Sequence, residues 1–197
     1  MKKSILLMFV IVTGLAVWQT EAAPVVIAGS ALESPPPFWE NCFWGMTATV
    51  ERAFPFTTIS GGPFYVEELQ VAVFSGSRAT FSIHLDNNGK PGQTVVGIFE
   101  TAGITSVQQV VSIQAAEETI LYSNTAYWLV GQTPQAQVNW NLADDVFGKA
   151  AYRVDQGNWV IFQYANVSAF SLLGSQVPEP ATLSLLAIGI ALLRKRK

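Results

Sequence analysis

The chain has a single histidine, His84, in a segment where apolar and polar residues alternate. If this segment is a strand, Phe81, Ile83 and Leu85 share one face, and Ser82 and His84 share the other. We therefore expect His84 to face solvent. No second histidine, neighbouring cysteine or Gly-x-Ser-x-Gly motif accompanies it, so we expect neither a metal site nor a serine nucleophile there.

Adjacent carboxylates occur at 67–68, 117–118 and 144–145. A glycosidase needs two carboxylates that face one substrate, whereas neighbours on a strand point to opposite faces. We expect solvated strand edges and no enzyme. A secreted glycan-active enzyme with acidic residues from separate strands remains the third alternative for function.

Residues 86–92 (Asp-Asn-Asn-Gly-Lys-Pro-Gly) are dense in turn formers. Asn and Gly suit positive φ, and proline fixes the exit, so a tight loop between strands is expected. A calcium loop is the alternative, but one carboxylate is few for Ca²⁺. No metal ion and no cofactor are expected.

Aromatic side chains are frequent in the second half, and exposed rings can stack on sugars. Tyr127 and Trp128 are adjacent, so in a strand one of them points outward. Core packing is the first interpretation of these rings. A carbohydrate-binding module that uses Trp128, Trp159 and Tyr127 as ligand aromatics is the alternative function.

Short strands punctuated by turn residues predict an all-β domain, a β-sandwich or jelly roll, over residues 45–174. An irregular, proline-rich lead (23–44) precedes it. The predicted strands are 65–75, 79–85, 95–101, 107–113, 126–132, 137–141, 150–154, 159–164 and 169–173.

The part between the chain ends is acidic: residues 23–177 contain five Lys or Arg against twelve Asp or Glu, a balance of −7. Such a domain cannot gain affinity by releasing nucleic-acid counterions, so nucleic acid is excluded as a partner. One cysteine, Cys42, rules out an internal disulfide. It is either a buried thiol or a link to a second chain.

Residues 1–22 are typical of a secretory signal peptide. Lys2 and Lys3 precede an apolar run, and small residues follow it, which predicts cleavage after Ala22. An uncleaved anchor is the alternative, but the run is shorter than the roughly 20 residues of a membrane span.

Residues 175–197 form a three-part tail: Pro178-Glu179-Pro180, an apolar stretch over 181–193, and a basic cluster. A helix over the stretch is about 20 Å long, which is short for a span but enough for a transient anchor. The basic cluster should stay cytoplasmic, which places the acidic middle outside the inner membrane. Its members are Arg194, Lys195, Arg196 and Lys197.

This tail resembles the PEP-CTERM sorting signal of Gram-negative, exopolysaccharide-producing bacteria, with Pro178, Glu179 and Pro180 as the motif. The resemblance implies that an exosortase, a membrane cysteine transpeptidase, cuts near the motif and delivers the domain to the envelope, surface or extracellular matrix, in association with exopolysaccharide. A GPI signal, the rival tail, lacks the terminal basic cluster.

The middle resembles the choice-of-anchor β-sandwich domains that precede such tails. The matching segments are 66–73, 81–85, the Asn-Gly-x-Pro-Gly turn at 88–92, 125–129 and Trp140. The resemblance implies a sandwich and transfers no catalytic residue.

Overall fold

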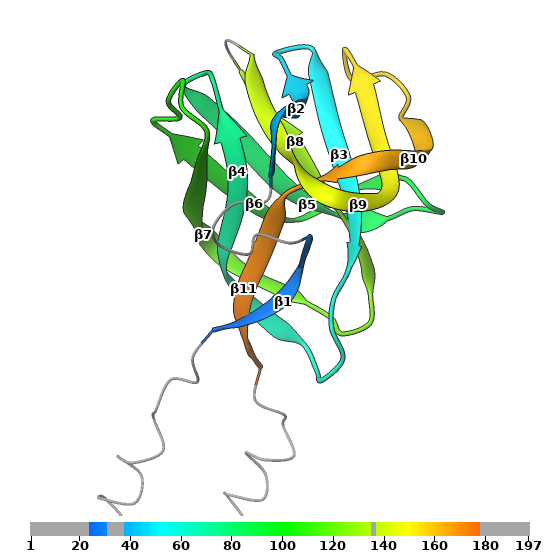
Figure 1. Cartoon of the computed structure of the whole chain (residues 1–197). Coiled ribbons are helices and arrows are strands. Elements are labelled where there is room, and N and C mark those ends of the chain that lie inside the picture. The colour runs from blue at the N-terminus through cyan, green and yellow to red at the C-terminus, as the bar shows by residue number, and fades with distance from the viewer. Residues whose placement is uncertain (1–23, 31–37, 135–136, 178–197) are drawn as a thin grey trace, which may run out of the picture.

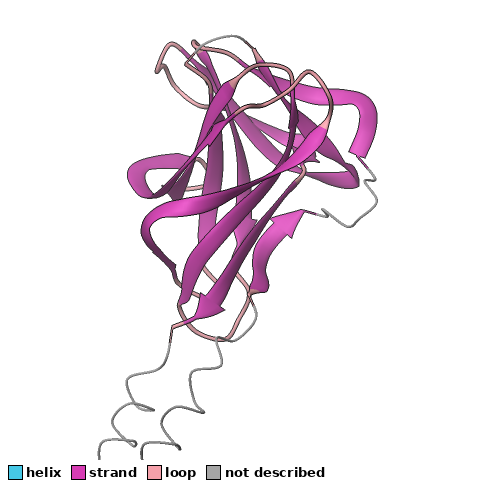
Figure 2. Ribbon diagram, turned by 90° about the vertical axis from the view of Figure 1, so that its left-hand side faces the viewer, coloured by secondary structure: helices cyan, strands magenta, loops and turns pink. Residues whose placement is uncertain are grey.

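The structure is a computed structural model that describes residues 24–30, 38–134 and 137–177. Within these ranges it contains strands and no helix, which confirms the all-β prediction (Figures 1 and 2). None of the described residues belongs to a helix that is long and apolar enough to cross a membrane. The strands are β1 (Val25–Ser30), β2 (Phe38–Met46), β3 (Val50–Thr57), β4 (Phe64–Phe74), β5 (Arg78–Asp86), β6 (Pro91–Ala102), β7 (Gln109–Leu121), β8 (Ala126–Gln132), β9 (Val138–Val154), β10 (Val160–Ser168) and β11 (Phe170–Gln176).

The strands pair antiparallel in two layers. In the first layer β4 lies between β7 and β11, β1 pairs with the outer edge of β11, and β2 pairs with the first half of β9. The second layer has the order β6-β5-β8-β3-β9-β10. We call these the first sheet and the second sheet.

Strand β9 belongs to both sheets and makes them one continuous ladder. Its beginning pairs with β2 and with the end of β4, and its last residues pair with β3 and β10 (Figure 1). The register against β10 shifts twice, as is typical where a bulged strand bends. The two strands predicted over 137–141 and 150–154 are therefore one strand of 17 residues.

The core lies between the two sheets around the indole of Trp140. Its ring makes edge contacts with Phe54 and Phe81 of the second sheet, at centroid distances of 5.0 Å each, and with Phe170 of the first sheet at 6.4 Å. Its Nε1 donates a hydrogen bond to the carbonyl oxygen of Ala169. Edge-on rings add to the free energy gained by burying apolar area, so this cluster holds the layers together.

Three strands lie where the sequence did not predict them. β1 and most of β2 fall within the expected irregular lead (23–44), β2 continues to Met46, and β3 follows at residues 50–57. Pairing overrides the local preference here: β1 is held by β11, and β2 by β9. The buried side chain of Ile27 joins the core and anchors β1.

The described part of the chain begins and ends at the same end of the sandwich (Figures 1 and 2). Val25 of β1 pairs with Gly174 of β11. After β11, the Val177 N–H donates a hydrogen bond to the carbonyl oxygen of Pro63, at 2.9 Å. All eleven strands of the described residues therefore end before Pro178.

Candidate functional site

The outer face of the second sheet carries a polar cavity of about 310 Å³. Five neighbouring strands, in the order β6-β5-β8-β3-β9, supply most of its lining, and the turn after β9 supplies the rest. We call it the outer-face cavity. It is lined by Glu51, Thr80, Ser82, His84, Val95, Ile98, Gln132, Arg153 and Gln156.

Strand register explains why these residues meet. Arg153 of β9 stands opposite Glu51 of β3. The next residue of β3, Arg52, pairs with Gly131 of β8. Glu51 therefore stands opposite Gln132, and Thr80 of β5 pairs with Gln132 from the other side. Side chains at directly opposed positions share one face of a sheet, so four strands present polar groups in one row.

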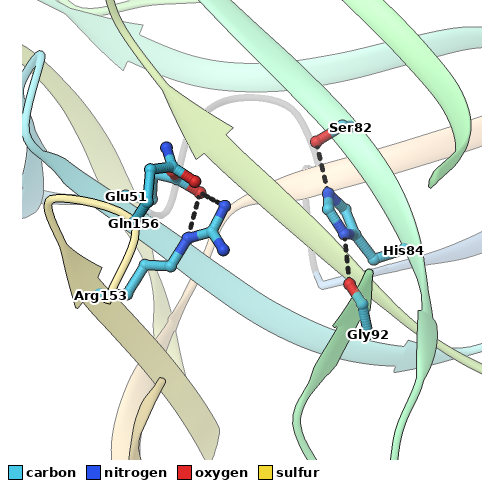
Figure 3. A network of polar contacts seen from close by, with 6 residues as sticks. All are labelled: Glu51, Ser82, His84, Gly92, Arg153 and Gln156. Carbon is cyan, nitrogen blue, oxygen red and sulfur yellow. Dashed lines mark hydrogen bonds and ion pairs between the residues drawn. The ribbon is translucent and has the colours of Figure 1, made fainter. Parts of the chain in front are cut away.

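A hydrogen-bonded ion pair lies at one end of this row. Arg153 donates to Oε2 of Glu51 through Nε at 2.9 Å and approaches the same oxygen through Nη2 at 2.8 Å. The other oxygen, Oε1, accepts a bond of 2.6 Å from Nε2 of Gln156 (Figure 3). The guanidinium also lies over the ring of Trp159, 4.7 Å from its centroid. Glu51 is only 5% exposed, and both oxygens of its buried carboxylate accept hydrogen bonds, as a buried charge requires.

His84 is at the other side of the cavity, and it is not solvent-facing as predicted: the residue is 8% exposed. Its Nδ1 lies 2.8 Å from the carbonyl oxygen of Gly92, and its Nε2 lies 2.9 Å from Oγ of Ser82 (Figure 3). A carbonyl only accepts, so Nδ1 carries the proton and Ser82 donates to Nε2. The strand alternation was predicted correctly, but Ser82 and His84 are both buried on this face, where Val95 of β6 and Trp128 of β8 stand opposite His84.

Burial lowers the pKa of His84 below its ordinary value of 6.5, and the charge of Arg153 acts in the same direction. The hydrogen bond to Gly92 and the charge of Glu51 oppose this shift. The imidazole is therefore neutral at physiological pH, as the tautomer assigned from its two hydrogen bonds requires.

Two of the three predicted ligand aromatics have no exposed ring. Tyr127 and Trp128 are each 1% exposed. The Tyr127 ring stacks on Phe56 in the core, and its hydroxyl accepts a bond from the Tyr122 N–H. Trp128 does point to the outer face, but it packs there with small and branched side chains, and its Nε1 donates to Asp86 at 2.7 Å.

Trp159 is the one predicted ligand aromatic with a partly accessible side chain. It is half-buried beside the same outer-face cluster and stacks on Arg153 next to the outer-face cavity. Its ring fixes the guanidinium through a cation–π contact.

Residues 87–90 form the predicted turn between β5 and β6. Asn88 and Gly89 have positive φ (55° and 80°), and the Gly89 N–H donates to Oδ2 of Asp86. The Asn87 N–H donates to the Lys90 carbonyl oxygen, at 2.9 Å. Among the residues that the structure describes, no cluster of three or more His, Cys, Asp or Glu could hold a metal ion.

A second depression, of about 410 Å³, lies between β6 and β7. It shares Val95 and Ile98 with the outer-face cavity, so the two depressions adjoin at these side chains. Its other wall carries Gln114, Glu117 and Glu118 of β7. We call it the side groove.

The sequence did not predict Glu51 or Arg153 as site residues. The only local signal is the alternation over 51–54, which puts Glu51 on the same face as Ala53 and opposite to the buried Phe54. A carboxylate at such a position needs a partner, but the partner is 102 residues away in sequence. Only the pairing of β3 with β9 identifies it.

The predicted sorting residues Pro178, Glu179 and Pro180 lie outside the described residues, as do the apolar stretch (181–193), the basic cluster (194–197) and the signal peptide (1–22). The last described strand, β11, ends at Gln176, so it includes the first two residues of the predicted tail (175–197). The tail is therefore continuous with β11, a central strand of the first sheet.

Comparisons with known proteins give one match. No curated protein and no solved structure matches the chain. Residues 176–197 match the family model of the PEP-CTERM protein-sorting motif. The two-layer all-β fold is compatible with the sandwich expected ahead of such a tail. The chain thus carries a PEP-CTERM protein-sorting motif, which implies an exported protein that an exosortase recognises and sorts to the cell envelope.

Proposed function

We propose that this chain is a non-enzymatic component of the cell surface or extracellular matrix, delivered by exosortase processing and associated with exopolysaccharide. The observation that carries the proposal is the match of residues 176–197 to the sorting motif, which begins at Gln176, the last residue of β11. In this role the β domain is the part that is exported, and the tail is the sorting signal that the exosortase recognises.

The end of the fold supports cleavage at the motif. β11 ends at Gln176, and the backbone bond from Val177 to Pro63 is the last one before Pro178. A cut within 178–180 removes none of the eleven strands. The exosortase can therefore release an intact domain.

The placement of the two ends supports the proposed topology. Val25 and Gly174 are paired neighbours, so the signal peptide and the tail both attach at one end of the sandwich (Figure 1). With cytoplasmic basic groups before the first apolar segment and after the second, both segments would enter the same membrane. The domain would then stand on the outer side with its β1–β11 end nearest the bilayer.

The direct test expresses the full chain in a Gram-negative host with and without an exosortase system. Intact mass spectrometry and fractionation then follow the product. We expect cleavage after Ala22 in both hosts, and loss of the tail near 178–180, with the domain outside the cell, only where the exosortase is present.

Glu179→Gln and a variant with Gln at 194–197 separate recognition from anchoring. Glu179→Gln should stay uncleaved in the inner membrane. The Gln variant should lose its orientation in the membrane, because the cytoplasmic charge that sets it is gone. Equal processing of Glu179→Gln and the parent chain, or an uncleaved parent chain, would contradict exosortase sorting.

A further inference from the structure

The outer-face cavity has the composition of a site for a ligand rich in hydroxyl groups. The polar row that begins at Arg153 continues through Thr80 to Glu100, its partner in β6. Four steps between neighbouring strands make the row about 19 Å long. Beside it, Val95 and Ile98 form an apolar shelf, 43% and 50% exposed. Ligand sites combine apolar surface with a few well-placed polar groups in this way.

Several hydrogen-bonding groups of the row are available to a ligand. The Thr80 hydroxyl and the Gln132 amide have no side-chain hydrogen bond within the described ranges, and Gln132 is exposed. Arg153 keeps N–H donors beyond those that it gives to Glu51. Donors and acceptors therefore stand side by side, which suits hydroxyl groups because a hydroxyl both donates and accepts.

The cavity also concentrates features that are costly for stability. The Glu51–Arg153 pair is largely buried. Replacement of a buried ion pair by apolar side chains of similar size often leaves the stability of a protein unchanged or raises it. Gln156 reaches Glu51 from a turn in which Asp155 and Gln156 both have positive φ (49° and 60°). Glutamine rarely adopts this conformation. Such costs cluster where a side chain is held in place for binding.

The charges around the cavity select against an anionic ligand. Arg153 is neutralised by Glu51, and the neutral His84 adds no positive charge. Glu100 lies at the end of the row, and Glu117 and Glu118 line the adjoining side groove. A polyanion would meet carboxylates and no unpaired cation among these residues, whereas a neutral glycan has no charge to be repelled.

We infer that the outer-face cavity binds a neutral polysaccharide. Arg153, Gln132 and Thr80 hydrogen-bond to the hydroxyl groups of successive sugar units along the row, and the shelf of Val95 and Ile98 packs against the apolar ring face of the unit nearest Thr80. The side groove shares that shelf and continues the path for neighbouring units, which suits a polymer. The inference rests on the proposed association with exopolysaccharide, for which it names the surface and the class of glycan.

The test is affinity electrophoresis of the full chain in gels that contain laminarin, dextran, galactomannan or, as the anionic probe, alginate. At least one neutral polysaccharide should retard the parent chain, and alginate should not. Thr80→Val and Gln132→Ala remove one polar group each from accessible positions and should each weaken binding about five- to tenfold. Glu51→Gln should weaken it as well.

Glu68→Gln is the matched control, because Glu68 of the first sheet also accepts bonds from two glutamines, Gln70 and Gln114. It should bind like the parent chain. Absence of binding to all three neutral polysaccharides, or equal binding by Thr80→Val, Gln132→Ala and the parent chain, would overturn the inference. Tail processing, followed by mass, is measured separately: a processed chain that binds no neutral glycan refutes the cavity alone, and an unprocessed chain that binds refutes the sorting alone.

Discussion

At the scale of single residues, His84 offers a direct measurement because it is the only imidazole in the chain. Burial lowers its pKa below 6.5, so as the pH falls the unfolded chain takes up a proton before the folded domain does. The stabilisation from neutral His84 is therefore fully present above pH 6.5 and is lost as the pH falls through the folded-state pKa. NMR titration of the ring should give a pKa below 6.5, and the free energy of unfolding should fall as the pH is lowered through this window.

His84→Gln is the control for that prediction, because it removes the titrating group and keeps hydrogen-bonding capacity at the site. The loss of stability with falling pH should be smaller in the variant than in the parent chain. A ring that titrates at or above 6.5 would contradict the buried, doubly hydrogen-bonded imidazole.

Gly131 is a second residue whose role is set by its neighbours. A Cβ atom there would lie 2.5 Å from Sδ of Met46 and 3.1 Å from ring atoms of both Phe81 and Trp140. All three side chains are buried in the core, so little space can open. Gly131→Ala should lower the free energy of unfolding by about 1–3 kcal/mol in urea denaturation. Gln132→Ala, the next residue and exposed, should change it by less than about 0.5 kcal/mol.

At the scale of elements, the β5–β6 turn positions the partner of His84. Gly89 has a φ of 80°, which a β-branched residue adopts only with strain. Gly89→Val should therefore cost about 1–2 kcal/mol of unfolding free energy. It should also change the NMR titration of His84, since Gly92 follows this turn and accepts the Nδ1 hydrogen bond. Lys90→Val, at an exposed position of the same turn, should leave both quantities close to those of the parent chain.

Element prediction from the sequence succeeded where the pattern was local. The segment 126–132 is a strand with the predicted bounds, and β4 and β5 differ from the prediction by one residue at each end. It failed where long-range pairing decides the structure. β1 and β2 are strands because β11 and β9 hold them, and β9 is continuous because its two halves pair with different sheets.

The candidate site was less predictable than the fold for the same reason. Ser82 and His84 were placed correctly on one face, but their burial depends on the strands beside β5. The Glu51–Arg153 pair depends on the register of β3 against β9. The sorting motif, by contrast, is a contiguous stretch, so order and spacing alone were enough to predict it.

At the scale of the whole molecule, loss of the tail should leave the stability of the domain unchanged. Within the part of the chain that the structure describes, every strand ends by Gln176, whereas β11 itself pairs with both β1 and β4 and places Phe170 and Leu172 in the core. Three chains that begin at Pro24 test this: 24–197, 24–177 and 24–169. The first two should unfold at the same urea concentration.

The chain 24–169 should show no cooperative unfolding transition. Without β11 the buried edge of β4 is exposed, β1 loses its partner, and Trp140 loses its contact with Phe170. Together these losses should exceed the roughly 5–15 kcal/mol that stabilises an ordinary domain. Removal of this one strand is therefore the contrast to removal of the tail. If 24–177 unfolded well before 24–197, the tail would be part of the fold, and an exosortase cut at 178–180 could not deliver a stable domain.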